Sequence, residues 1–292
     1  MVTQEDMQSV EEMRQSSRIR DAKREGKGEE IFLHLEGRTI RALLYKSDME
    51  NAPVIFDIHG GGFVSGYPEE DVLFCNMARD RLNATVISIE YRKAPEHPYP
   101  QDKLDAYDAI AYIARHAQEF GIDIRQMVIG GHSAGGNIAT VVCMMANERK
   151  EFSFCCQYLA YPALDLTSSD CRIEGVTPHK YASLFRKLYC EKTQQTEPYC
   201  SPVFAENRQI CVMPGTVMLS CEKDTLRDQA TTYGKRLSEV GVEVIYKRFI
   251  GAVHGFNVLE DSQMAIDGNE YLIDGIAHFL QKNIRRIQKE NG

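Results

Sequence analysis

The chain has 292 residues, of which 43% are hydrophobic, and a formal net charge of -8. This length and composition suffice for one large α/β domain with its own core, and the acidic balance argues against a general affinity for nucleic acid or for an anionic membrane surface. Because the chain has neither a leader-like apolar start nor a run of about 18 apolar residues, we expect a cytoplasmic protein without a membrane span.

The nine cysteines are scattered along the chain without a C-x-x-C pair. This distribution favours reduced, buried thiols over a disulfide framework or a zinc site. The sequence also lacks a Walker lysine motif, H-E-x-x-H and G-x-G-x-x-G. We therefore expect no metal and no cofactor.

The N-terminal part of the chain predicts a helix followed by a hairpin. Residues 1–28 are polar with apolar side chains at loosely helical spacing, which is typical of an amphipathic helix that needs a surface to lie on. Two strand-like runs, 31–35 and 39–46, flank the turn Glu36-Gly37-Arg38 and predict a β-hairpin.

From residue 54 onwards, strand-like and helix-like segments alternate. We predict strands over 54–59, 85–89, 127–130, 154–160, 216–221 and 242–249, and helices over 71–82, 103–120, 134–146 and within 264–287. Alternation of this kind is typical of an α/β fold with a mostly parallel sheet and helices on both faces. The last strand could form an exposed edge, which leaves a homodimer open.

One long interval, 163–213, lacks a core strand and interrupts this alternation. It contains Tyr181, Phe185 and Tyr189 at i, i+4 and i+8. This stripe predicts either a helix packed on the body of the domain or the wall of an acyl pocket, and we favour packing with some residues serving both purposes. An insertion of this size inside an α/β domain usually carries function.

The predicted strand 127–130 leads into Gly131-His132-Ser133-Ala134-Gly135 and then into a helix-like segment. A sharp strand-to-helix turn requires small residues two positions before and two positions after its central serine. The segment therefore predicts a nucleophile elbow with Ser133 at its tip.

A nucleophilic serine needs a base, and the base needs a third group that holds it in one tautomer. In the α/β-hydrolase arrangement these follow in the order Ser, acid, His, on loops after later strands. Asp224 and His254 occupy such positions, which predicts a triad with Ser133.

Three other residues compete for these roles. Asp228 falls in the first turn of a predicted helix, where the helix dipole explains an acid. His278 lies within a predicted helix and is assigned a structural role. His132 adjoins the serine, but neighbouring side chains on a sharp elbow project in opposite directions, so we expect it to point into the body of the protein.

The string His59-Gly60-Gly61-Gly62-Phe63 follows the predicted strand 54–59. Three glycines let backbone amides turn toward a substrate without interference from side chains. The string is thus a candidate source of donors for the oxyanion of an acyl-transfer intermediate.

With these motifs in order, the chain resembles the hormone-sensitive-lipase-like esterases, also called bacterial family IV or α/β-hydrolase-3. The resemblance covers residues 53–256. Its motifs are H-G-G-G-F at 59–63, Y-R-K-A-P-E-H-P-Y-P at 91–100, G-H-S-A-G-G-N at 131–137, D-T-L-R-D at 224–228 and H-G-F at 254–256.

The resemblance implies an α/β-hydrolase domain over 1–292, with a helical cap built from 1–28 and 163–213. It also implies Ser133 as nucleophile, His254 as general base and acid, and Asp224 as the group that orients His254. The implied oxyanion donors are the amides of Gly61, Gly62 and Ala134. We expect the substrate-binding side chains to be Phe63, Tyr181, Phe185 and Val253.

One residue departs from the family pattern, because His132 stands where the family usually has an acid. The triad is unaffected, but the charge pattern beneath it is altered. The expected function is that of a serine carboxylesterase acting on small-molecule esters with short acyl groups, acetyl above all, through an acyl-enzyme. Two alternatives stay open: an amidase or deacetylase on the same triad, and a non-catalytic ligand receptor on this scaffold.

Overall fold

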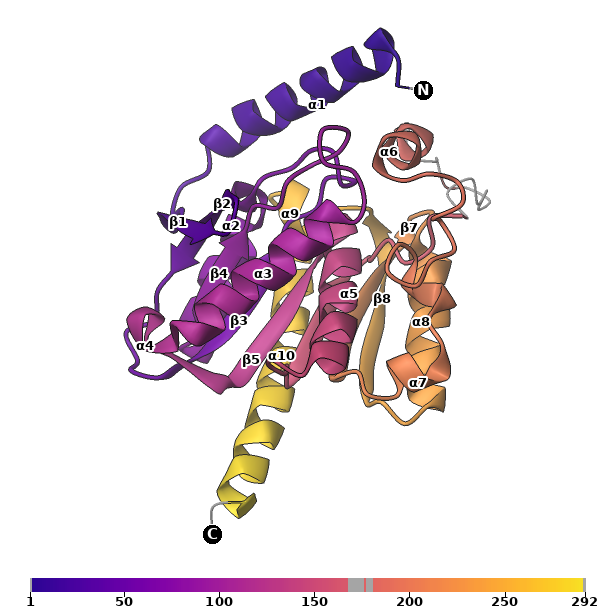
Figure 1. The fold of residues 1–292 in the computed structure, drawn as a ribbon. Helices are drawn as coiled ribbons and strands as arrows, with labels where there is room; N and C mark the ends of the chain where they lie inside the picture. The colour runs from indigo at the N-terminus through magenta and orange to yellow at the C-terminus, as the bar shows by residue number, and fades with distance from the viewer. Residues whose placement is uncertain (1, 168–175, 177–180, 291–292) are drawn as a thin grey trace.

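The computed structural model describes residues 2–167, 176 and 181–290. Within this part of the chain the strands form one eight-stranded sheet in the order β1-β2-β4-β3-β5-β6-β7-β8 (Figure 1). The strand β2 is antiparallel to both of its neighbours, and the other pairings are parallel. The strands are β1 (Glu29–Leu35), β2 (Arg38–Tyr45), β3 (Ala52–Ile58), β4 (Thr85–Ile89), β5 (Ile122–His132), β6 (Cys156–Ala160), β7 (Gly215–Lys223) and β8 (Val244–Val253).

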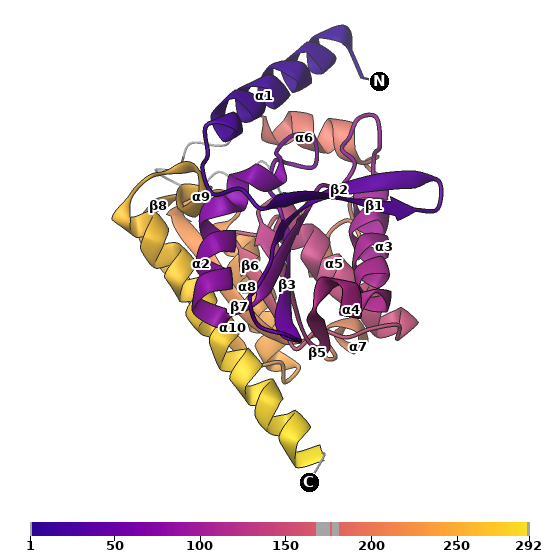
Figure 2. The ribbon, with the colours of Figure 1, turned by 90° about the vertical axis from the view of Figure 1, so that its left-hand side faces the viewer.

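Helices cover both faces of this sheet. They are α1 (Gln4–Ala22), α2 (Val72–Leu82), α3 (Gln101–Arg115), α4 (Ala117–Phe120), α5 (Ala134–Arg149), α6 (Ala182–Tyr189), α7 (Asn207–Ile210), α8 (Arg227–Glu239), α9 (Phe256–Leu259) and α10 (Gln263–Glu290), with short 3-10 turns η1 (Pro68–Asp71) and η2 (Pro202–Phe204). The helices α2 and α10 lie on one face, and α3, α5 and α8 lie on the other (Figure 2). Among the described helices, none is both long enough and apolar enough to cross a bilayer.

The central strand β3 shows why the core has two halves. Val54, Phe56 and Ile58 belong to the apolar cluster beneath α3, α5 and α8, whereas Ile55 belongs to the cluster beneath α2 and α10. Successive side chains of a strand point to opposite faces, and every residue of β3 is buried because both faces are covered. The expected mostly parallel α/β sheet is confirmed, as is the position of β8 at an edge.

Several predicted boundaries differ from the structure, and two of the differences have a clear cause. The helix expected over 103–120 is divided into α3 and α4 at His116, whose Nδ1 donates to the Tyr112 carbonyl at 2.7 Å and so satisfies an end group of α3. The strand expected from residue 127 begins earlier, because Ile122 already pairs with Ala52 of β3.

The helix α1 lies across the end of the domain that holds the serine elbow, and polar contacts fasten it there (Figures 1 and 2). Arg14 donates to the Val64 carbonyl at 2.8 Å and to the Ala94 carbonyl at 2.9 Å, and it binds Glu96 through both terminal nitrogens. Val10 is the one deeply buried apolar side chain that α1 contributes among its described residues. Directional bonds, more than apolar burial, therefore hold α1.

A buried carboxylate, Asp105, ties three segments together. Its oxygens accept from Arg38 Nε at 2.7 Å and from Arg92 Nε and Nη2, both at 2.8 Å, and also from the Arg92 backbone amide at 3.0 Å. Arg38 begins β2, Arg92 follows β4 and Asp105 lies on α3, so one fully buried side chain joins the hairpin, a loop and a helix.

We predict that Asp105→Ala lowers the free energy of unfolding by about 3–5 kcal/mol, because it leaves two guanidinium groups without their shared carboxylate. Chemical denaturation measures this loss. The matched control is Asp80→Ala, since Asp80 pairs with Arg79 but is 62% exposed, and its removal should cost less than about 1 kcal/mol. Equal stabilities of the two variants would contradict this assignment.

Candidate active site

Ser133 stands between β5 and α5 in a strained backbone conformation, with φ 55° and ψ -114°. Its amide donates to the Ala160 carbonyl at 2.9 Å, and its carbonyl accepts from the Ala163 amide at 3.1 Å. A Cβ placed on Gly131 would lie 2.2 Å from the Ile58 carbonyl oxygen, and one placed on Gly135 would lie 1.8 Å from it. The spacing of the two glycines is therefore set by the close approach of β3.

The structure brings the three predicted triad residues into one line of contacts. His254 Nε2 lies 2.9 Å from Ser133 Oγ, and His254 Nδ1 lies 2.7 Å from Asp224 Oδ2. Asp224 directly follows β7 and His254 directly follows β8, so neighbouring parallel strands deliver both side chains to one edge. Because a carboxylate only accepts, Nδ1 carries the proton and the Nε2 lone pair faces the serine hydroxyl.

Two opposing effects act on the pKa of His254. Burial lowers the pKa of His254, whereas the charge of Asp224 and its hydrogen bond raise it, and the net shift is upward from the usual 6.5. Asp224 is itself 3% exposed and also accepts from the Leu226 amide at 2.9 Å. The carboxylate is thus held in place from two directions.

The competing residues lie elsewhere. Asp228 is 65% exposed and pairs with Arg227 and Arg248 on the surface. His278 lies 2.8 Å from Glu243 and its side chain is half exposed, so it makes a hydrogen bond at the surface. Neither residue lines the cavity described below.

The glycine string after β3 forms a tight loop. Gly61, Gly62 and Phe63 all have positive φ, at 109°, 62° and 67°. The Tyr91 hydroxyl donates to the Gly60 carbonyl at 3.2 Å, and the Ser65 amide donates to the Gly61 carbonyl at 2.9 Å. These bonds fix the path of the loop.

The three amides expected to serve as oxyanion donors, those of Gly61, Gly62 and Ala134, meet no acceptor among the described residues. Gly61, Gly62 and Ala134 line the same cavity as Ser133. Ala134 opens α5, where the first backbone amides of a helix have no partner within the helix. All three amides are therefore available to an oxygen of a bound molecule.

A cavity of about 780 Å³ surrounds the serine and reaches beneath α1 and α6. The four side chains expected to bind substrate, Phe63, Tyr181, Phe185 and Val253, all line it. They differ in exposure, since Val253 is 44% exposed and Phe63 only 3%.

The aromatic stripe of the insertion serves both packing and the cavity. Tyr189, at the end of α6, is buried and stacks on Phe63 with a centroid distance of 3.9 Å. The ammonium group of Lys103 lies 4.6 Å from the centre of the Phe63 ring. The Phe185 ring covers Gly62 so closely that a Cβ there would lie 2.3 Å from it. Tyr189 and Lys103 support the glycine loop, a role that no local sequence signal indicated.

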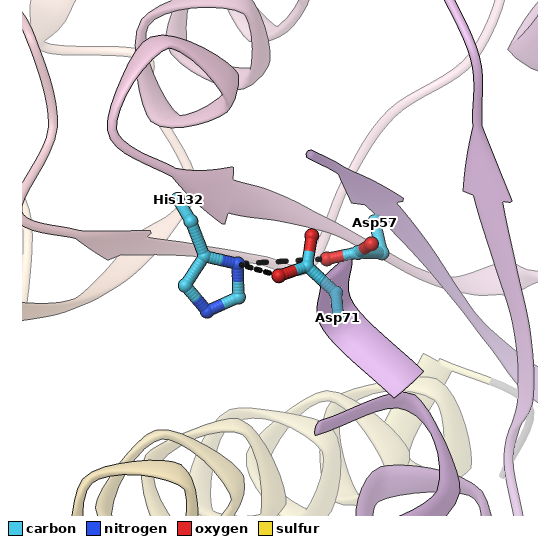
Figure 3. Close-up of side chains that lie close together, drawn as sticks. All are labelled: Asp57, Asp71 and His132. Carbon is cyan, nitrogen blue, oxygen red and sulfur yellow. Dashed lines mark ion pairs between the residues drawn. The ribbon is translucent and has the colours of Figure 1, made fainter. Parts of the chain in front are cut away.

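His132 turns into the body of the protein, as expected, and is 1% exposed. Its Nδ1 lies 3.0 Å from an oxygen of Asp71 and 4.0 Å from an oxygen of Asp57 (Figure 3). Burial lowers the pKa of His132 to about 4. The position before Ser133 therefore carries a neutral imidazole at neutral pH.

A family model described as alpha/beta hydrolase fold, Abhydrolase_3, matches residues 55–258, a region that holds the elbow, the glycine loop and both triad loops. The chain belongs to this family. The fold class and the hormone-sensitive-lipase-like resemblance expected from the motifs are confirmed by this match.

Two relatives with similar sequences carry esterase names. Esterase LipI of Mycobacterium tuberculosis is 32% identical over 219 residues, which cover 72% of this chain and 67% of LipI. Carboxylic ester hydrolase LipN of the same organism is 29% identical over 244 residues, which cover 79% of this chain and 64% of LipN. The chain thus spans about two thirds of the length of these relatives.

A solved structure supports the same family assignment. A hyperthermophilic esterase from the archaeon Pyrobaculum calidifontis superimposes with a TM-score of 0.82 at 30% identity, covering 95% of this chain and 93% of that one. At 95% coverage of this chain, the likeness extends beyond residues 55–258.

We predict that Gly135→Ala lowers the free energy of unfolding by more than about 3 kcal/mol, because the backbone carbonyl that its Cβ would meet has no room to move. Thermal unfolding of purified protein measures this. The control is Gly234→Ala within α8, whose Cβ would meet the flexible Met218 side chain at 3.3 Å and Val244 Cγ1 at an ordinary contact distance of 3.8 Å. A Gly135→Ala protein as stable as the control would refute the argument from close approach.

Proposed function

We propose that this chain is a serine carboxylesterase that hydrolyses small-molecule esters with short acyl groups. The observation that carries the proposal is the unbroken line of contacts from Asp224 through His254 to Ser133. It is supported by three amides in the same cavity that meet no acceptor in the described part of the chain, and by the esterase names of the relatives.

In the proposed reaction, Ser133 Oγ attacks the ester carbonyl while His254 Nε2 takes the hydroxyl proton. Negative charge moves to the former carbonyl oxygen, where the amides of Gly61, Gly62 and Ala134 would donate to it. His254 then returns the proton to the leaving alcohol, and an acyl-Ser133 ester remains. Water, activated by the same imidazole, releases the acid and restores the serine.

The preference for short acyl groups rests on the cap side of the cavity. The Phe185 ring lies directly against Gly62, so the space next to the proposed oxyanion donors is closed by an aromatic side chain. An acetyl group needs little room there, whereas we expect a long acyl chain to meet the ring. We also propose that α1 and the segment 163–213 act together as a cap over this space.

We predict that kcat/KM for p-nitrophenyl acetate exceeds that for the octanoate by at least about tenfold, which corresponds to roughly 1.4 kcal/mol of transition-state free energy. Phe185→Ala should lower this ratio, because it removes the ring that closes the cavity next to Gly62. Ser133→Ala should lower kcat/KM for both esters by at least about 1,000-fold. Initial rates across the acyl series measure all three effects, and an active Ser133→Ala protein would disprove the proposed function.

The pH dependence follows from His254, which must be neutral to accept a proton. Since Asp224 raises the pKa of His254, kcat/KM should fall as the pH drops through a midpoint above 6.5. In Asp224→Asn only the lowering effect of burial remains, so the midpoint should move below 6.5 and kcat should drop by about 10,000-fold. The control is Asp228→Asn, which should leave the midpoint unchanged. An unshifted midpoint in Asp224→Asn would contradict the role given to Asp224.

A further inference from the structure

A row of buried amide and imidazole groups lies behind the serine elbow. His132 Nε2 lies 3.1 Å from the side-chain nitrogen of Asn257, which also donates to Asn269 Oδ1 at 2.7 Å. The Asn269 side-chain nitrogen in turn donates to the Asn257 backbone carbonyl at 3.0 Å. All three side chains are 1% exposed or less.

This row determines where the proton of His132 resides. The Asn257 backbone carbonyl can only accept, so the amide nitrogen of Asn269 must face it and the Asn269 oxygen must face the side chain of Asn257. The group that Asn257 presents to both Asn269 and His132 is therefore its NH2. Because that NH2 donates to Nε2, His132 is neutral and carries its proton on Nδ1.

The other side of the imidazole faces two acids. Asp57 accepts from the hydroxyls of Ser88 and Tyr158, each at 2.6 Å, whereas Asp71 accepts no well-aligned hydrogen bond among the described residues and has only the His132 Nδ1 beside it, at 3.0 Å. Burial raises the pKa of Asp57 to about 7 and that of Asp71 well above its usual range. Two neighbouring buried carboxyl groups do not both ionise, and Asp57, whose charge two hydroxyls stabilise, is the better placed to ionise, so Asp71 stays protonated.

The same three residues also have the composition of a cation site, since ligand atoms of Asp57, Asp71 and His132 all lie within 4.8 Å of one another. A histidine that binds a metal through one nitrogen normally donates its other N–H to an acceptor. Here the other nitrogen faces the NH2 of Asn257, so the Nδ1 lone pair is occupied by a proton. The cluster is therefore better described as a proton-bearing network (Figure 3).

The network connects the two reacting side chains of the proposed esterase. His132 directly precedes Ser133, and Asn257 lies on α9, immediately after the loop of His254. The Tyr161 hydroxyl donates to Asn257 Oδ1 at 2.6 Å, and the Tyr161 ring packs on the His254 ring at a centroid distance of 4.7 Å. One buried contact, His132 to Asn257, thus joins the serine elbow to the histidine loop.

We propose that His132, as the neutral tautomer with its proton on Nδ1, is a positioning residue that fixes His254 relative to Ser133 through Asn257 and Tyr161. This inference rests on the proposed function, since it concerns the geometry of that reaction. Misplacing a reacting group by about 1 Å costs on the order of 100-fold in rate. Loss of the contact should therefore lower kcat while leaving KM nearly unchanged.

The kinetic test compares His132→Leu, which has no acceptor, with His132→Gln, whose Oε1 can accept from Asn257. We expect His132→Leu to lower kcat by about 10- to 100-fold with KM within about threefold of wild type. His132→Gln should recover most of that loss. The matched control, His278→Leu on the exposed face of α10, should keep the wild-type kcat. A His132→Leu protein with wild-type kcat, or a loss confined to KM, would overturn the proposal.

A second measurement does not depend on activity. Nitrogen-15 NMR of the histidine rings in the wild-type protein should show two buried imidazoles with a protonated Nδ1 and an unprotonated Nε2, unchanged from pH 8 to about pH 5. One belongs to His132 and the other to His59, whose Nδ1 donates to the Gly60 carbonyl at 2.7 Å. His132→Gln removes one of these two signals and so assigns it. For the His132 ring, a proton on Nε2, a positive charge, or a shift of Nδ1 on adding zinc would each overturn the proposal. An inactive wild-type protein with the expected ring signal would count against the proposed function alone.

Discussion

The close approach of the Ile58 carbonyl to the serine elbow is the constraint on which the rest of the site depends. It excludes a side chain at Gly131 and at Gly135, and it places the strained Ser133 backbone beside the end of β3. The same strand then continues into the loop that begins at His59. The position of the serine and the position of the amides of Gly61 and Gly62 are therefore set by one strand end, and a shift of β3 against β5 would move both.

The helices that cover the cavity also contact the glycine loop, and so they influence the positions of its backbone amides. Arg14 of α1 binds the Val64 carbonyl just beyond that loop, and Tyr189 of α6 stacks on Phe63 within it. The two covering helices also meet each other, since Lys187 lies 2.6 Å from Asp6. A movement of either helix would therefore shift Phe63 and the glycine loop. For this reason, substrate access to the cavity and the positions of the proposed oxyanion donors are coupled.

Local patterns in the sequence were enough to predict the sheet, the elbow and the three side chains, Ser133, Asp224 and His254, that meet beside it. Each of these depends on local backbone geometry that restricts the residue types nearby in the sequence. Examples are the glycines at fixed offsets from Ser133 and the acid just after a buried strand. Boundaries were less predictable, as the division of the third helix at His116 shows. Contacts between segments that are distant in the sequence could not be predicted in this way, because they restrict no nearby residue types. That Phe185 lies on Gly62, or that Asn257 sets the tautomer of His132, depends on distant segments meeting in space.

The central claim is that Ser133 is an activated nucleophile, and a fluorophosphonate probe tests it most directly. Such a probe phosphonylates a serine only when a base removes its proton and amides accept the developing charge. Mass spectrometry of a wild-type digest should find one adduct per chain, on Ser133, and its formation should slow in Asp224→Asn. A wild-type protein that stays unmodified, or one modified at another serine while Ser133 remains free, would contradict the account.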